Sequence, residues 1–259
     1  MNVKNWSRKK KILLGLISLI AITLVLYPPT VRSWMEKWGT TEIERNMTLP
    51  DDDFISNPKV VTNHAITIDA PPTEVWKWLV QVGGYRAGWY SLTWAENLFG
   101  MGIYNKYEIR PEWQNLELGP LCFNQIGDCW PVVDIEPGKY LVLHIDNRVD
   151  DSDWDSIFYA STGETVKLRM WKSFPDDDYL DLTSWILYIE ELPDGKSRLI
   201  SRMHKTWETE KPIQNFMFKL SGEEMHCLMD IEMLKQIKDC AEGNASKYTN
   251  TPLPEGGIN

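Results

Sequence analysis

Residues 65–79 have the sequence AITIDAPPTEVWKWL, and this stretch decides the fold. Its first part completes a segment, residues 60–69, in which every second position suits one face of a strand. Two prolines end that strand, and a helix begins at Thr73, a suitable N-cap residue, with an apolar stripe that continues to Val82. The stretch therefore predicts a strand followed directly by an amphipathic helix, which a Gly-Gly pair ends.

Five more strands are expected after residue 119, separated by turns. Pro137-Gly138 and the Asp-Gly turn within 192–196 connect neighbouring strands, which makes their pairing antiparallel, because a parallel pair needs a long crossover. A long helix is expected from Pro212 to about Ala241. This order predicts an α+β helix-grip fold, a curved antiparallel sheet of about six strands wrapped around a long C-terminal helix. The five later strands are expected at Trp130–Glu136, Lys139–Asp146, Glu164–Lys172, Thr183–Glu191 and Ser197–Trp207.

The first 29 residues predict an N-terminal transmembrane helix. Five cations between Lys4 and Lys11 precede an uncharged run from Ile12 to Tyr27, ILLGLISLIAITLVLY. As a helix this run spans about 24 Å, less than the ~30 Å bilayer core, but flanking residues and snorkelling lysines can complete a crossing. A cleaved signal peptide is the alternative, although residues 27–34 lack the pair of small residues that cleavage needs. Because cations stay on the cytoplasmic side, we expect a single-pass cell-membrane protein with a cytoplasmic N-terminus and its globular domain outside the cytoplasm.

The rest of the chain is expected to form one domain. About 230 residues can bury one sizeable core, and no Gly/Ser linker, repeat or low-complexity tract divides them. The 37 acidic residues outnumber the 27 basic ones, and this charge repels phosphate backbones, so no nucleic-acid partner is expected. The expected division is an anchor at 1–29, a membrane-proximal lead-in at 30–59, a globular domain at 60–243 and a flexible tail at 244–259.

The sequence has no Gly-x-Ser-x-Gly elbow, Walker loop, dinucleotide-binding Gly-x-Gly-x-x-Gly or His-Glu-x-x-His motif, and its four histidines lack ligand spacing. Asp151, Asp153 and Asp155 begin like a calcium loop, but Ser156 and Thr162 stand where that loop needs glycine and glutamate. We therefore expect no catalytic residue, no cofactor and no metal ion.

Cys122 and Cys129 flank the segment FNQIGD, which is short enough for them to meet across a turn, either as a disulfide or as two free thiols. Cys227 and Cys240 would lie roughly 20 Å apart along one helix, too far to bond each other.

Glu224 does not suit the apolar stripe of the expected C-terminal helix. Steps of 3.6 residues place Met217 and Leu220 on that stripe, with Phe216 at its border, and Glu224 follows in the same phase. Either a break in the helix turns this carboxylate to water, or it faces a cavity, where burial would raise its pKa and let it bind ligand or donate a proton. His64, in register with the apolar residues of its strand, is likewise either a satisfied core residue or a ligand contact.

The opening stretch also carries a family resemblance. Residues 65–79, continued by QVGGYRAGWYSLTWAENL at 81–98, resemble the SRPBCC superfamily of START-like and polyketide-cyclase-like helix-grip proteins, and in particular a bacterial membrane-anchored branch of it. Pro111–Gln114 and Leu118-Gly119 match the same branch, and the likeness covers residues 33–210. The resemblance implies a hydrophobic cavity between the sheet and the C-terminal helix. It implies no particular reaction, because this superfamily includes carriers, receptors and enzymes.

The favoured hypothesis is a non-enzymatic, membrane-tethered binder or carrier of a small hydrophobic molecule, either a lipid or an aromatic compound. One alternative is a cyclase or dehydratase that uses Glu224 or His64 as general acid and base. Another is an envelope interaction protein with a filled cavity, whose protein partner the sequence does not identify. The expected ligand-binding residues are Trp89, Tyr90 and Trp94 at the entrance, Trp185, Leu187 and Met203 on the sheet, Phe216, Met217 and Leu220 on the helix, and Glu224 as the polar contact.

Overall fold

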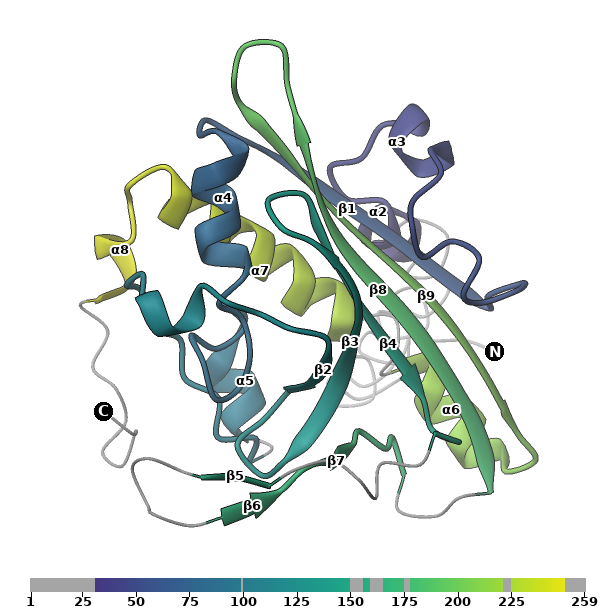
Figure 1. Ribbon diagram of the computed structural model, residues 1–259. Helices are drawn as coiled ribbons and strands as arrows, with labels where there is room; N and C mark the ends of the chain where they lie inside the picture. The colour runs from purple at the N-terminus through teal and green to yellow at the C-terminus, as the bar shows by residue number, and fades with distance from the viewer. Residues whose placement is uncertain are drawn as a thin grey trace, which may run out of the picture.

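The computed structural model describes residues 31–98, 100–149, 156–158, 165–174, 178–220 and 225–249 (Figure 1). The expected anchor at 1–29 and the last ten residues lie outside this part of the chain. Within the described ranges, no helix combines the length and the apolar character that a membrane crossing requires.

Six strands form one antiparallel path in the order β1, β9, β8, β4, β3 and β2. The short strand β7 (Arg169–Met170) pairs with β3 in parallel, so the sheet is mixed at this edge. The α+β class and the antiparallel hairpins are thus confirmed. The expected strand at 164–172 is wrong as one element, because β6 (Thr165–Lys167) pairs instead with β5 (Ser156–Phe158) in a separate small sheet. The six strands are β1 (Val60–Ile68), β2 (Gly119–Cys122), β3 (Asp128–Glu136), β4 (Tyr140–Asp146), β8 (Tyr179–Glu191) and β9 (Ser197–Thr209).

Helices α4 (Pro72–Leu79) and α7 (His226–Ala241) lie on the same face of the sheet (Figure 1). α6 (Pro212–Leu220) packs near the end of β9, and residues 221–224 between α6 and α7 lie outside the described residues. The C-terminal helical region expected from Pro212 is therefore seen as two helices. The shorter helices are α2 (Ser33–Glu36), α3 (Glu42–Asn46), α5 (Thr93–Leu98), the 3-10 helix η3 (Pro111–Trp113) and α8 (Ser246–Thr249).

The hydrophobic core lies between the sheet and the two helices α4 and α7. Alternation places Trp185 and Leu187 of β8 on the helix-facing side, where Met203 of β9 is the direct neighbour of Trp185. Leu234 and Ile237 of α7 pack against this layer and are fully buried. The apolar residues that alternate along the strands and those that recur every 3.6 residues along the helices thus pack in one cluster. Burial of this cluster is the main source of stability expected for a domain of this size.

A buried ion pair joins α7 to β1. His64 Nδ1 lies 2.5 Å from Asp230 Oδ2, and His64 Nε2 donates to the carbonyl oxygen of Met35 at 2.8 Å. Both side chains are at most 1% exposed. Burial alone would raise the pKa of Asp230, but the hydrogen bond from His64 and the charge of that side chain outweigh burial and lower this pKa. Because a carbonyl oxygen only accepts and Asp230 is ionised, both nitrogens of His64 carry protons.

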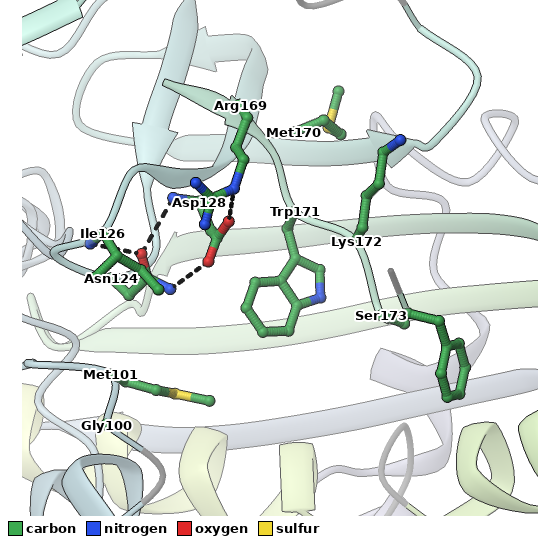
Figure 2. A pocket seen from close by; sticks show the side chains of 11 residues that line it. Gly100, Met101, Asn124, Ile126, Asp128, Arg169, Met170, Trp171, Lys172 and Ser173 are labelled. Atoms are coloured by element: carbon green, nitrogen blue, oxygen red, sulfur yellow. Dashed lines mark hydrogen bonds and ion pairs between the residues drawn. The ribbon is translucent and has the colours of Figure 1, made fainter. Parts of the chain in front are cut away.

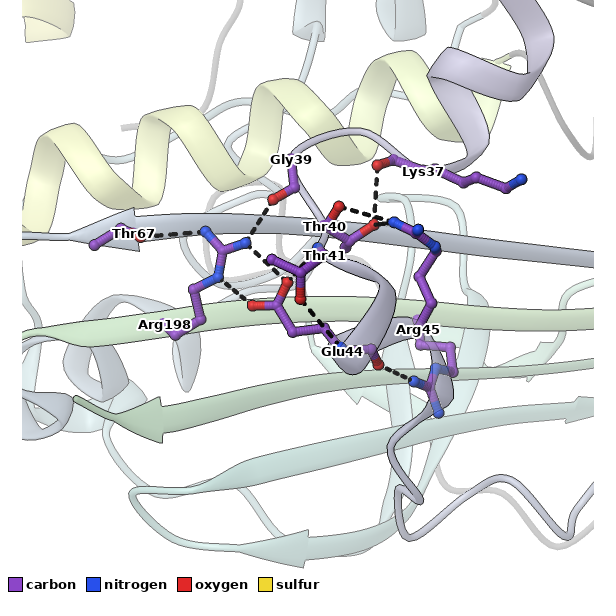
Figure 3. Close-up of polar contacts among 9 residues, drawn as sticks. Lys37, Gly39, Thr40, Thr41, Glu44, Arg45, Thr67 and Arg198 are labelled. Atoms are coloured by element: carbon purple, nitrogen blue, oxygen red, sulfur yellow. Dashed lines mark hydrogen bonds and ion pairs between the residues drawn. The ribbon is translucent and has the colours of Figure 1, made fainter.

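The lead-in wraps around the edge strand β1 and contacts both faces of the sheet. Met35 contacts His64 on the helix side, whereas α3 lies on the opposite side, where Arg198 binds Glu44 at 2.6 Å and also donates to the carbonyl of Gly39 (Figure 3). Gly39 has φ 73°, and a Cβ there would lie 2.1 Å from the carbonyl oxygen of Ala65, so only glycine permits this close approach.

Further along, the lead-in buries polar groups against the outer face of the sheet. Asp51 is fully buried, and Ser184 Oγ donates to its carboxylate at 2.6 Å. Asp52 forms an ion pair with Arg202 at 2.8 Å. Leu49 packs beside them in a small apolar cluster. The segment from Glu44 to Asp52 is therefore held mainly by side chains of β8 and β9 rather than by its own helix.

We expect Asp230→Asn to lower the free energy of unfolding by about 3–5 kcal/mol, because it leaves the imidazolium of His64 buried without its counter-ion. Urea unfolding followed by tryptophan fluorescence measures this loss. Asp239→Asn is the matched control, since Asp239 lies on the same helix and pairs with Lys247 at the surface, and it should cost about 1 kcal/mol or less. Equal losses for the two variants would contradict the proposed role of the pair.

Stability should also fall as the pH is lowered below 6.5. Burial lowers the pKa of His226 from 6.5 to about 4, so between these values the unfolded chain binds the proton and the folded chain does not. This group alone costs about 3 kcal/mol by pH 4. Asp51 acts in the opposite direction, because burial raises its pKa to about 6 and protonation there favours the folded state. Between pH 7.5 and 4.5 the unfolding free energy should fall further for Asp51→Asn than for the wild type, whereas for His226→Gln it should rise relative to the wild-type change, because the opposing effect of Asp51 remains.

Candidate functional site

A pocket of about 640 Å³ lies at the edge of the sheet where β7 joins β3 (Figure 2). One part of its lining is polar and the other is apolar, with the Trp171 ring pointing into it. Its volume is in the range that holds small organic ligands, about 300–1,000 Å³. The lining residues are Gly100, Met101, Asn124, Ile126, Asp128, Arg169, Met170, Trp171, Lys172, Ser173 and Phe174.

Asn124, Asp128 and Arg169 form the polar wall. The Asn124 side-chain oxygen accepts from the backbone N–H groups of Ile126 and Asp128, both at 3.1 Å, which folds the loop back on itself. Its amide nitrogen donates to Asp128 Oδ2 at 2.7 Å, and Arg169 Nε lies 2.6 Å from Asp128 Oδ1. Asp128 is nearly buried, whereas the Arg169 side chain is 52% exposed. The carboxylate thus holds a guanidinium at the pocket where a polar ligand group can reach it.

Backbone contacts bring Arg169 to this position. The Arg169 N–H donates to the carbonyl of Gly127 at 2.9 Å, and β7 then pairs with β3 through two residues. Gly127 has φ 95°, and a Cβ there would lie 2.4 Å from the carbonyl oxygen of Lys167. A side chain at residue 127 would push away the backbone at Lys167, which leads into β7. The pocket wall formed by Arg169 therefore depends on glycine at this position.

A series of aromatic rings connects the pocket to the core. Trp171 lies 5.4 Å from the Phe123 ring, and Phe123 lies 5.7 Å from Trp89 and 5.9 Å from Trp130. Trp89 stacks on Trp185 at 5.7 Å, and Trp130 meets the same ring edge-on at 5.6 Å. These separations are those of favourable ring pairs, so the pocket has a stiff aromatic base that continues into the sheet–helix core.

The structure divides the expected ligand-binding residues into three groups. Five of them are buried together in the core. Three are exposed, by 72% for Trp94, 61% for Phe216 and 39% for Met217, and the structure does not bring them to the other five. The side chain of Leu220 and all of Glu224 lie outside the described residues. Trp89 contacts the Phe123 ring, which in turn contacts Trp171 of the pocket. Contact of any of the ten expected residues with a ligand stays a prediction. The buried five are Trp89, Tyr90, Trp185, Leu187 and Met203.

Tyr90 has a structural role in this core. It has φ 53°, an unusual conformation for a residue with a side chain, and the Asn105 side chain accepts its backbone N–H at 2.9 Å. Gln81 donates to its hydroxyl at 2.6 Å, and burial raises the pKa of that hydroxyl above its usual range. These contacts fix the backbone next to Trp89, which is itself part of the aromatic base of the pocket.

His64 does not have the geometry of a general base. Both of its nitrogens donate, one to Asp230 and one to Met35, so neither has a lone pair for a substrate proton. Close by in the core, His226 Nε2 and Asp230 Oδ1 are buried without a hydrogen-bond partner among the described atoms. His226 touches the Trp185 ring at 5.2 Å, edge-on, and burial keeps it neutral at pH 7.

The polar wall of the pocket was not expected from the sequence. The Asn-x-x-x-Asp spacing of Asn124 and Asp128, with Gly127 between them, is a signal for a side-chain-stabilised loop and could have been found. Arg169 could not, because it lies 41 positions after Asp128 and reaches it only through the two-residue pairing of β7 with β3.

Comparison with known proteins gives only distant structural likenesses. No protein-family model matches the sequence, and no curated protein matches it significantly. Among solved structures, protein MLL2253 from Mesorhizobium loti is 14% identical, with 69% of this chain and 96% of that chain covered and a TM-score of 0.33. CalU16 from Micromonospora echinospora is 13% identical, with coverage of 73% and 84% and a TM-score of 0.28. Ara h 8.0201 is 13% identical, with coverage of 72% and 97% and a TM-score of 0.23. Scores this low carry no argument about family, ligand or reaction.

Gly127→Ala should lower the free energy of unfolding by about 3 kcal/mol or more, because it adds a backbone clash to an unfavourable φ. Gly138→Ala is the control, since Gly138 has φ 82° but no atom within 4 Å of the added Cβ, and it should cost only about 1 kcal/mol. Urea unfolding of both variants measures the difference. If the two cost the same, β7 does not depend on the close approach at Gly127.

Proposed function

We propose that this protein is a helix-grip member of the SRPBCC superfamily that binds a small apolar or aromatic molecule without transforming it. The pocket beside β7 carries this proposal. Its volume of about 640 Å³ suits a molecule of a few hundred daltons. The likeness of residues 65–114 to that superfamily supports the same conclusion, as does a sheet that holds α7 against its inner face.

The lining of the pocket explains the proposed preference for planar or apolar ligands. Trp171 and Phe174 offer ring faces and edges, and Met101 and Met170 are flexible, polarisable side chains that adapt to irregular shapes. The polar wall of Asn124, Asp128 and Arg169 then orients a hydrogen-bonding group of the ligand. Lys172 and Ser173 add further polar groups to the lining, so the pocket suits an apolar or aromatic molecule that also carries a polar group.

The proposed site would lie close to a membrane. The sequence of residues 1–29 supports a single crossing with the globular domain outside the cytoplasm. The described chain begins at Val31, and already at Met35 it is bonded to His64 of β1. Few residues separate the end of the uncharged run from the packed domain. A domain on so short a connection stays near the bilayer surface, a suitable position for receiving an apolar molecule.

Native mass spectrometry of the full chain, released from detergent micelles, tests the proposal. We expect a reproducible adduct of a few hundred daltons, distinct from the detergent, that organic solvent removes. Trp171→Ala should reduce the adduct about tenfold or more, because it removes the ring that points into the pocket. Trp94→Ala is the control, because Trp94 is 72% exposed and does not line the pocket.

Two outcomes would contradict this proposal. One is a chain that carries no adduct and also fails to retain any member of a panel of fatty acids and aromatic acids. The other is an adduct that Trp171→Ala leaves unchanged, which would place the bound molecule elsewhere.

A further inference from the structure

Cys122 and Cys129 lie directly opposite each other in the antiparallel pair of β2 and β3. They therefore point to the same face of the sheet, and both are buried there together with Leu168, as free thiols in this structure. The six residues between them, Phe123–Asp128, supply Asn124, Ile126 and Asp128 to the pocket, and we call this segment the pocket loop.

The hydrogen bonds around the two cysteines show which kind of cross-strand pair they form. The Phe123 N–H donates to the Asp128 carbonyl at 2.7 Å, so the next pair outward is of the non-hydrogen-bonded kind. Consistent with this, both cysteine carbonyls accept from other segments, Cys122 from Gly84 at 2.7 Å and Cys129 from Trp171 at 3.0 Å. Pairs of this kind have Cα atoms about 4.5 Å apart, within the range of about 4.4–6.8 Å that a disulfide spans.

We propose that Cys122 and Cys129 are a modification site, at which a disulfide closes across β2 and β3 and fixes the pocket loop. The second cysteine pair of the chain provides the contrast. Cys227 and Cys240 are both buried on α7, thirteen residues apart, and the helix axis keeps them separate. Of the two pairs, only Cys122 and Cys129 are brought together by the fold.

The chemistry of the bond is thiol–disulfide exchange with a donor disulfide, such as oxidised glutathione or a disulfide oxidoreductase. One cysteine thiolate attacks the donor and releases a first thiol, and the second cysteine then resolves the mixed disulfide and releases another. The two cysteines lose two protons and two electrons, and the donor is reduced to two thiols. Contact with Cys129 and burial raise the pKa of the Cys122 thiol, so the exchange belongs to the folding chain, before the pair is buried.

The consequence concerns the pocket. Within the loop, one backbone hydrogen bond from Phe123 to Asp128 and the contacts of the Asn124 side chain hold the two ends together. Bonds from outside also anchor it, since Trp89 Nε1 donates to the Phe123 carbonyl, the Gln125 N–H donates to the Met101 carbonyl, and the Arg169 N–H donates to the Gly127 carbonyl. A covalent bond at its base removes the opened conformations in which Asp128 would no longer hold Arg169. The importance of this for ligand binding rests on the proposed function, whereas formation of the disulfide does not.

Refolding of the reduced full chain in a buffer of oxidised and reduced glutathione tests the proposal. After alkylation with iodoacetamide in denaturant and digestion, the peptide with Cys122 and Cys129 should carry no alkyl group and be about 2 Da lighter than its reduced form. Cys227 and Cys240 should each be alkylated. In Cys122→Ser the remaining Cys129 should become alkylated, and Cys227→Ser should leave the disulfide intact. Alkylation of Cys122 and Cys129 to the same extent as the other two would overturn the proposal.

Hydrogen–deuterium exchange tests the effect on the pocket loop without any ligand. Amides of the loop should exchange about tenfold more slowly in the disulfide form than after reduction. The hairpin turn at 192–196 should exchange at the same rate in both forms. Equal rates for the loop in the two forms would overturn the locking role while leaving the disulfide itself established. Neither result depends on the adduct measured for the proposed function, so the two proposals can fail separately.

Discussion

The ion pair of His64 and Asp230 is the interaction on which the rest of this structure depends. It joins residues 166 positions apart, and the second nitrogen of His64 extends the connection to Met35 of the lead-in. Two charges out of water are stable only while their geometry holds, so displacement of α7 or α2 would leave a charge buried alone. Apolar packing can tolerate some sliding of a helix on a sheet, whereas this pair allows a single position. The lead-in is thereby bound to the same core as the sheet and α7.

The pocket lies at the edge of the sheet opposite to β1, and side chains on one face of the sheet connect it to α7, the helix of Asp230. His226 lies four residues before Asp230 on α7 and touches Trp185, and the aromatic series continues through Trp89 and Phe123 to the pocket. Helix α7, which the ion pair joins to β1, therefore holds the inner end of this series, and β7 holds its outer end. The pocket wall is built differently from the core, since it depends on backbone contacts at a glycine and on one carboxylate that holds a guanidinium. The loop residues of such a binding site can be substituted without disturbing the hydrophobic core beneath it.

The predictions from sequence succeeded where a pattern is local and failed where a contact is long-range. The alternation in 60–69 and the Asp-Gly turn correctly indicated β1 and the β8–β9 hairpin, because period and turn chemistry act between near neighbours. Trp89 was expected at the entrance of a ligand site and Trp185 on the sheet, and the structure stacks the two rings in the core. The expected strand at 164–172 was wrong, because its residues pair with two different partners, and only the tertiary fold decides which strand edge is free to accept them.

The sequence alone determined the class of the fold, the antiparallel order of its hairpins and the apolar character of its core, because each follows from side-chain periodicity and turn residues. Only the tertiary structure decided the role of His64, whose two partners are far away in the sequence, and the position of the pocket. The polar wall arises where a loop between two cysteines meets a two-residue strand, and no local preference specifies such a meeting. The register of a sheet brings such groups together, and register is a property of the whole packed domain.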